Sequence, residues 1–179
     1  LRGALAKALN CRGHSFDDPL NFGHEPWLLG LVRYQPGKEA RGRPGIAPHQ
    51  DSGLFTMLYT DGSPGLQLCP SWKGSGYHRD SSMHSADLEW LDVASVPGHW
   101  VVNMGTLMQR WTAGRCHAAL HRVIQPVNNA ARYSIPFFYE ANLDASIVAL
   151  SDDSDESKQK QKKTKLTSPG DLMLKMARR

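Results

Sequence analysis

Short apolar runs, each bounded by turn residues, recur along most of this chain and limit the folds that it can adopt. Runs rich in Val, Ile, Leu and aromatic residues between Gly, Pro and Asp are typical of β-strands. Strands are expected at Trp27 to Tyr34, Leu54 to Tyr59, Gly65 to Cys69, Leu88 to Val93, Trp100 to Asn103, Ala118 to Ile124 and Arg132 to Tyr139. The first of these runs is apolar enough to be a buried strand. Short strands at this density predict a mainly β protein, built as a sandwich or barrel.

The segments between the strands are expected to be helices or loops. Leu1, Leu5 and Leu9 recur at four-residue spacing, which predicts the end of a helix over residues 1 to about 10. Residues 35–48 are rich in Pro and Gly and residues 70–87 are polar, so both are expected to be loops.

A charged segment follows the last expected strand. Residues 151–165 consist of an acidic block and then a basic block, without an apolar side chain. Such a segment cannot bury enough surface to offset its ordering entropy, so we expect it to be disordered. Residues 166–179 regain Leu and Met after a Pro-Gly-Asp start and are expected to form a C-terminal helix.

Charge and cysteine content narrow the class of protein. The net charge of +4 comes partly from the lysines of residues 151–165, so it does not indicate a nucleic-acid partner. The three cysteines are odd in number and form no C-x-x-C pair, which argues against a disulfide framework or a thiolate zinc site. No apolar run reaches the length of a membrane span, and the first residues lack the apolar core of a signal peptide. We expect a soluble, cytoplasmic monomer without a membrane partner.

His49-Gln50-Asp51 is the first candidate for a metal site. In an extended chain residues i and i+2 point to the same side, so His49 and Asp51 share a face while Gln50 points away. The spacing alone is weak evidence, because about 0.8 triplets of the type H-x-[DE] are expected by chance from eight His and 17 acidic residues.

The sequence contains a second triplet of this type, His78-Arg79-Asp80. It lies inside the polar loop with Gly and Ser on both sides, whereas the first triplet runs directly into an expected strand. A strand can fix the geometry of metal ligands and a solvated loop cannot. We therefore assign the metal site to the first triplet.

A third ligand must come from another strand, and His121 is the candidate. It lies in the apolar run AALHRVIQP, where a buried imidazole needs a partner. Taken alone, it is better explained as a core histidine bound to a backbone carbonyl. Two imidazoles and one carboxylate on one face of an iron leave positions open for O₂ and a chelating cosubstrate. His49, Asp51 and His121 are therefore candidate iron ligands and catalytic residues.

Arg132 and Ser134 begin the last expected strand and lie on one of its faces. A guanidinium donates two parallel hydrogen bonds to a carboxylate, and a hydroxyl adds a third, so the pair is a candidate carboxylate clamp. An isolated Arg on an apolar strand is more often part of a structural ion pair. The order H-x-D, then a lone His, then R-x-S is more specific than any of its parts.

Three segments together resemble the isopenicillin N synthase-like family of Fe(II)/2-oxoglutarate dioxygenases. They are HQDSGLFTMLYTDGSPGLQL, WLDVASVPGHWVVNMGTLMQRWTAGRCHAALHRVIQP and RYSIPFFYEAN, and the resemblance covers about residues 27 to 150. It implies a double-stranded β-helix, or jelly roll, with a few flanking helices. It also implies that His49, Asp51 and His121 hold Fe(II).

The same resemblance implies roles for four residues outside the metal triad. Arg132 and Ser134 would bind the distal carboxylate of 2-oxoglutarate. Tyr34 matches a family tyrosine that reaches the cosubstrate or the substrate, and Phe138 matches an aromatic residue of the substrate pocket. Plain core packing explains Phe138 equally well.

The resemblance also predicts a division of the chain. The family has a helical N-terminal region, of which residues 1–26 would be a remnant, with the rest missing. Residues 27–150 would form the oxygenase core, residues 151–165 a disordered insertion and residues 166–179 a C-terminal helix.

The implied activity is oxidation of a small organic molecule by hydroxylation, desaturation or cyclisation, with release of succinate and CO₂. Fe(II), 2-oxoglutarate and O₂ would be required, with ascorbate as a candidate reductant. One alternative is a non-catalytic or truncated oxygenase-like scaffold that binds metal or a partner without turnover. A second is a zinc hydrolase that uses His117 and His121, although the Glu of H-E-x-x-H is missing.

Overall fold

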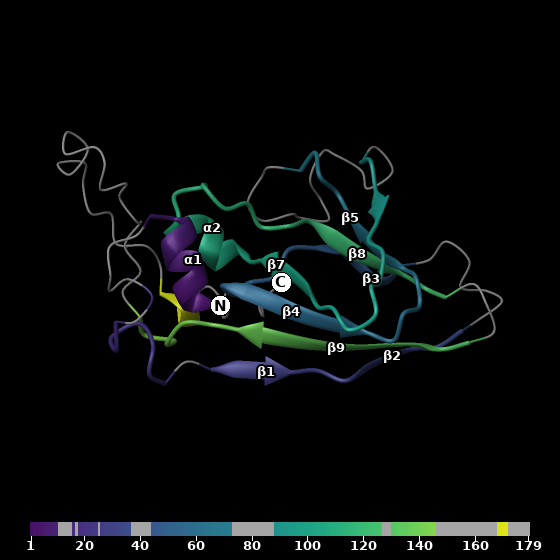
Figure 1. The fold of residues 1–179 in the computed structure, drawn as a ribbon, viewed down its shortest axis with the longest axis horizontal. Coiled ribbons are helices and arrows are strands. Elements are labelled where there is room, and N and C mark those ends of the chain that lie inside the picture. The colour runs from purple at the N-terminus through teal and green to yellow at the C-terminus, as the bar shows by residue number, and fades with distance from the viewer. Residues whose placement is uncertain are drawn as a thin grey trace.

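Two antiparallel sheets form most of the computed structural model (Figure 1). One sheet has the order β1-β9-β4-β7, with β2 also paired to β9, and the other has the order β3-β8-β5-β6. The expectation of a mainly β protein is confirmed. The structure describes residues 1–10, 16, 18–24, 26–36, 44–72, 88–126, 130–145 and 168–171.

The strands are short and the two described helices are shorter than three turns. The strands are β1 (Trp27–Leu29), β2 (Val32–Tyr34), β3 (Pro44–His49), β4 (Phe55–Thr60), β5 (Leu66–Leu68), β6 (Leu91–Asp92), β7 (Val101–Met104), β8 (His121–Ile124) and β9 (Arg132–Tyr139). The helices are α1 (Arg2–Ala8) and α2 (Thr106–Trp111), and neither could cross a lipid bilayer.

β9 is the strand on which the larger sheet is built, because it pairs with β1, β2 and β4. Its side chains alternate as a half-buried strand requires: Arg132 and Ser134 are buried and Tyr133 is exposed. Ser134, Pro136 and Phe138 line the cavity between the two sheets. The face predicted to carry the carboxylate clamp is therefore the inner face.

An aromatic core holds α2 against the end of the larger sheet. The ring of Trp111 lies 5.0 Å from that of Phe16 and 5.5 Å from that of Phe22, and Phe22 stacks on Tyr139 of β9. Leu5 of α1 packs against the same core, and Figure 1 shows the two helices together at one end of the sheets. The position of α2 relative to β9 is thus fixed by packing.

The prediction of one buried strand from Trp27 to Tyr34 is wrong. The run forms two strands, β1 and β2, interrupted at Gly30 and Leu31, and Trp27 and Leu31 are 64% and 81% exposed. The reason is position: β1 lies at the edge of the sheet and pairs with β9 alone. Apolar composition does not distinguish a central strand from an edge strand.

The prediction of a loop over residues 35–48 is also wrong at its end, because Pro44–His49 is β3. This strand lies at the edge of the smaller sheet and pairs with β8 through an irregular register. An edge strand tolerates proline, since one row of its N–H groups needs no partner in the sheet.

Other expected elements are shorter than predicted or lie outside the described residues. The strand expected at Leu88 to Val93 is reduced to Leu91–Asp92, and that expected at Ala118 to Ile124 begins at His121. Residues 73–87 and 151–165 lie outside the described part, and of the expected C-terminal helix only 168–171 is described.

Candidate metal centre

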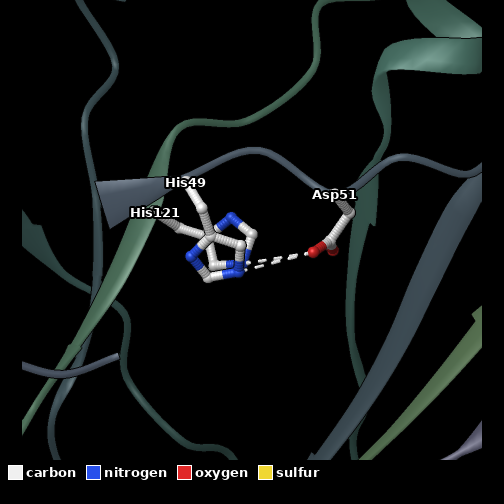
Figure 2. Close-up of side chains that lie close together, drawn as sticks. All are labelled: His49, Asp51 and His121. Carbon is white, nitrogen blue, oxygen red and sulfur yellow. Dashed lines mark ion pairs between the residues drawn. The ribbon is translucent and has the colours of Figure 1, made fainter. Parts of the chain in front are cut away.

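His49, Asp51 and His121 converge on the wall of the cavity, and Figure 2 shows both imidazole rings directed toward the Asp51 carboxylate. His49 is the last residue of β3 and His121 is the first residue of β8. The two are direct partners in the antiparallel ladder, which places their rings 4.2 Å apart between centroids. Strand pairing therefore brings together two residues that are far apart in the sequence.

The distances in this cluster suit a single metal ion. Asp51 Oδ1 lies 3.5 Å from His49 Nε2 and 3.8 Å from His121 Nε2. One potential ligand atom from each residue lies within 4.8 Å of those of the other two. Two ligand atoms that each lie about 2.1 Å from one metal ion are separated by roughly 3 to 4 Å.

Both histidines are oriented by the same local device. His49 Nδ1 lies 2.9 Å from the carbonyl oxygen of Ala47, and His121 Nδ1 lies 2.9 Å from that of Ala119. A carbonyl only accepts, so each Nδ1 carries the hydrogen and donates it. The lone pair of each neutral ring is then on Nε2, the atom that faces Asp51.

The Asp51 carboxylate is held on its other side by two neutral donors. Thr56 Oγ1 donates to Asp51 Oδ2 at 2.5 Å, and Asn103 Nδ2 donates to the same oxygen at 2.8 Å. These two residues are direct partners in the β4–β7 ladder. They occupy Oδ2 and leave Oδ1 directed at the two histidines.

The electrostatics favour an ionised carboxylate beside the imidazoles. Burial alone would raise the pKa of Asp51, but its hydrogen bonds, that with His49 first, and the charge of His121 hold it well below its usual value. Burial lowers the pKa of His121, which favours its neutral, metal-binding form. The pKa of His49 is raised, because its contacts with Asp51 and Ala47 outweigh a burial that is less complete than that of His121.

Arg132 lies on β9 opposite Tyr34 of β2, with its guanidinium carbon 4.9 Å from the centroid of the Tyr34 ring. It is 1% exposed, and its Nε donates to the carbonyl oxygen of Ser63 at 3.4 Å. Its Nη1 is buried and has no hydrogen-bond partner among the described residues. The structure also contains no ion pair of Arg132 within the described ranges.

A buried N–H group without a partner is costly, and more so on a charged group. Among the described residues no protein atom satisfies Nη1 of Arg132, and an anionic ligand could do so. Ser134 lies two residues further along the same face and lines the cavity, as does Tyr34. The expected clamp residues are thus brought to one place.

The cavity has a volume of about 470 Å³ and is mostly apolar. Phe138 lines it, together with Leu58, Val93 and Met104. His117 also lines it but is not part of the metal cluster. The chain before β8 is not helical, so the spacing of His117 and His121 does not give them a common helix face. His78 and Asp80 lie outside the described residues.

Several residues around the centre were not found from the sequence. Thr56 and Asn103 support Asp51, and Glu140 is 7% exposed and accepts a hydrogen bond from Ser52 Oγ at 3.2 Å. Gln109 contacts the segment that leads to His121. Of these residues only Thr56 could have been proposed from the sequence, because it occupies an inward position in an expected strand. The contacts of the others depend on how the two sheets and α2 pack together.

Comparisons with known proteins show which family this chain resembles. The sequence profile of the 2OG-Fe(II) oxygenase superfamily matches residues 26–141. A 2-oxoglutarate-Fe(II) type oxidoreductase of Aspergillus fumigatus is 34% identical over 142 residues, which cover 76% of this chain and 36% of the relative. The 2-oxoglutarate-dependent dioxygenase frbJ of Dothideomycetidae sp. is 36% identical over 151 residues, which cover 82% of this chain and 37% of the relative. The chain spans little more than a third of the length of these curated relatives.

Solved structures share the fold. A full-length Neurospora crassa protein, solved in complex with alpha-KG and 5-formyluracil, has a TM-score of 0.74 at 23% identity, covering 98% of this chain and 54% of that one. The rice dioxygenase for auxin oxidation has a TM-score of 0.68 at 27% identity, covering 98% and 53%. The expected jelly-roll fold is confirmed. The superfamily profile covers well over half of the residues of this chain. This chain therefore belongs to the 2OG-Fe(II) oxygenase superfamily.

Proposed function

We propose that this chain is the catalytic core of an Fe(II)- and 2-oxoglutarate-dependent dioxygenase that oxidises a small organic molecule, with release of succinate and CO₂. The observation that carries the proposal is the convergence of His49, Asp51 and His121 on a cavity that Ser134 and Tyr34 also line, with Arg132 opposite Tyr34 in the sheet. Two imidazole nitrogens and one carboxylate oxygen are the donor set of non-haem Fe(II) oxygenases.

In this proposal His49 Nε2, His121 Nε2 and Asp51 Oδ1 hold the metal. Bound Fe(II) and 2-oxoglutarate together supply the activation of O₂. Thr56 and Asn103 fix the carboxylate so that one oxygen faces the metal position. The protein thereby orients its ligands before the metal binds.

Arg132 and Ser134 bind the distal carboxylate of 2-oxoglutarate in the same proposal. The unpartnered Nη1 of Arg132 supports this role, because a carboxylate satisfies a guanidinium edge with parallel hydrogen bonds. Tyr34 supports the guanidinium with its ring face and lines the cosubstrate end of the cavity.

The substrate is proposed to be a small and largely apolar molecule. A cavity of about 470 Å³ with apolar walls, Phe138 among them, excludes water and holds such a molecule beside the metal. The structural relatives named above were solved with a modified uracil or are named for auxin oxidation, both small molecules. Hydroxylation, desaturation and cyclisation all remain within the proposal, as does ascorbate as a reductant.

The proposed extent of the core and the proposed cellular location each rest on one observation. The superfamily match over residues 26–141 supports an oxygenase core at 27–150. Cys69 and Cys116 are free thiols, which supports a reducing, cytoplasmic location. We propose that the chain acts as a monomer without nucleic acid.

The test measures whether the chain converts 2-oxoglutarate to succinate in the absence of an organic substrate. The purified chain is supplied with Fe(II), 2-oxoglutarate, ascorbate and O₂, and succinate is measured. Slow formation of succinate that requires both Fe(II) and O₂, and that the Asp51→Ala variant lacks, is the expected result. A chain that binds Fe(II) and 2-oxoglutarate without forming succinate would instead be the non-catalytic scaffold.

A further inference from the structure

We propose that Gln50 and Gln109 form a clamp on the backbone of Ala118 that positions His121 relative to Asp51. The clamp consists of two hydrogen bonds to the peptide groups on either side of the Ala118 Cα. This inference rests on the proposed role of His49, Asp51 and His121 as metal ligands. Gln50 and Gln109 are positioning residues, since they act on the metal through the chain that carries His121.

The two glutamines bind Ala118 from opposite directions. Gln50 Nε2 donates to the carbonyl oxygen of Ala118 at 2.8 Å, and the Ala118 N–H donates to Gln109 Oε1 at 2.7 Å. All three residues are buried, with exposures of 5%, 9% and 1%. A carbonyl only accepts and an N–H only donates, so these contacts fix which end of each side-chain amide faces Ala118.

The clamp joins His121 to the two other ligands by a direct route. Gln50 is the residue between His49 and Asp51, and its side chain points away from the metal position. The Gln50 side chain, which points away from the metal position, thus binds the segment that carries His121. The side-chain amide of Gln50 thus connects the two ligand-bearing segments directly.

A second route runs from Asp51 through α2. The N–H of Thr106 donates to the carbonyl oxygen of Asp51 at 2.8 Å, and the N–H of Leu107 donates to that of Ser52 at 3.0 Å. The first turn of α2 is therefore bound to the ligand-bearing loop. Gln109, in the next turn of α2, accepts a hydrogen bond from the Ala118 N–H and so links the helix to Ala118.

The chain from Ala118 to His121 is held at each peptide group. The Ala119 N–H, in the same peptide group as the Ala118 carbonyl, donates to Met104 O at 3.3 Å. The next carbonyl, that of Ala119, accepts from His121 Nδ1 at 2.9 Å, and Leu120 O accepts from the N–H of Cys69 at 2.9 Å. A rotation of the peptide at Ala118 would therefore displace the acceptor that orients the His121 ring.

The clamp acts on the part of the chain that precedes the described strand pairing. The described pairing of β8 with β3 begins at His121, opposite His49, and its pairing with β5 begins at His121, opposite Leu68. A ligand at the first position of a strand is constrained by the ladder on one side only. The glutamine contacts constrain it on the other side.

The test compares metal affinity with fold stability in the 179-residue chain. Mn(II) is the probe, because it is stable in air and takes the same nitrogen and oxygen ligands. Gln50→Met and Gln109→Met keep the side-chain length and remove the hydrogen bonds. Each is expected to weaken Mn(II) binding about 10- to 100-fold, the effect of losing an outer contact that orients a ligand.

Gln67→Met is the matched control. Gln67 lies on β5 and bonds the side chains of Asp92 and Arg122, but contacts no backbone group of the segment before His121. Its Mn(II) affinity is expected to stay within about twofold of wild type, as for groups that do not orient a ligand. If a Met variant does not fold, Gln50→Asn or Gln109→Asn, which keeps the amide but is too short to reach Ala118, replaces it.

Wild-type Mn(II) affinity in both glutamine variants would overturn the clamp. A lower unfolding temperature together with that unchanged affinity would show that the two glutamines have a purely structural role. His121→Ala, measured in parallel, separates this failure from that of the proposed site. Full Mn(II) affinity in His121→Ala would contradict the site itself, whereas loss there with unchanged glutamine variants would contradict the clamp alone.

Discussion

Thr56 Oγ1 lies 2.5 Å from Asp51 Oδ2, and this contact turns the other carboxylate oxygen toward the two histidines. Asn103, the direct partner of Thr56 in the β4–β7 ladder, donates to the same oxygen. A carboxylate with both donors on one oxygen is prepared to bind a metal through the other. Two residues of the larger sheet therefore orient Asp51, which lies in the loop that follows β3 of the smaller sheet.

Removing either donor should weaken the metal centre without removing a ligand. Thr56→Val and Asn103→Ala are each expected to weaken Mn(II) binding by about tenfold, because the Asp51 carboxylate loses its fixed orientation. Isothermal titration of Mn(II) measures this. Thr60→Val is the control, since Thr60 lies on the same strand but its hydroxyl contacts Ser95 Oγ. Equal losses in Thr60→Val would mean that β4 is merely destabilised.

Glu140 should make the metal-free fold less stable as the pH rises. Burial raises its pKa to about 7, with a contribution from the charge of Asp51 and despite the hydrogen bond from Ser52. Between pH 4.5 and 7 the folded chain therefore binds more protons than the unfolded chain, so this contribution to stability falls through that window. Glu140→Gln should remove the effect.

The measurement is urea unfolding of wild type and Glu140→Gln at pH 5, 6, 7 and 8. The stability of the variant relative to wild type is expected to rise across this range by at most about 3 kcal/mol. Glu89→Gln, at an exposed position, should follow wild type throughout. Parallel pH dependence of wild type and Glu140→Gln would show that Glu140 keeps its ordinary pKa.

Arg132→Lys should weaken 2-oxoglutarate binding while leaving Mn(II) affinity unchanged. A lysine is a point charge that cannot form two parallel hydrogen bonds, and a poorly satisfied buried carboxylate costs about 1 to 3 kcal/mol. The dissociation constant should rise roughly 10- to 100-fold. Calorimetric titration of 2-oxoglutarate into the Mn(II)-loaded chain measures it.

Arg33→Lys is the matched control for this substitution. Arg33 lies on the neighbouring strand β2, and its Nε donates to the exposed hydroxyl of Tyr133 at 3.0 Å. Unchanged 2-oxoglutarate affinity is expected there. An unchanged affinity in Arg132→Lys as well would mean that Arg132 holds a different ligand.

The sequence was sufficient for elements whose pattern is local. β9 was predicted with its bounds, because RYSIPFFY is a run rich in aromatic residues. β3 was missed because its prolines favour a loop, and only its place at a sheet edge makes it a strand. The exposure of Trp27 was missed for the same reason: an edge position is a property of the whole sheet.

The candidate site divides in the same way. His49 and Asp51 are two positions apart, and an extended backbone places two such residues on one face. Thr56 and Asn103 meet only through strand register, and Gln109 reaches Ala118 only because the aromatic core fixes α2. Neither of these two contacts can be predicted from the spacing of the residues along the chain.

The central claim is that the two histidines and Asp51 hold Fe(II) in a position that 2-oxoglutarate can reach. Anaerobic addition of Fe(II) and then 2-oxoglutarate, followed by visible absorption, tests it most directly, because the chelate gives a weak charge-transfer band. His99→Ala is the control, since His99 Nδ1 also contacts the carbonyl two residues earlier, that of Pro97, but lies outside the metal cluster. We expect the band in wild type and in His99→Ala and none in His121→Ala. A band of wild-type intensity in His121→Ala, or no band in wild type, would contradict the assignment.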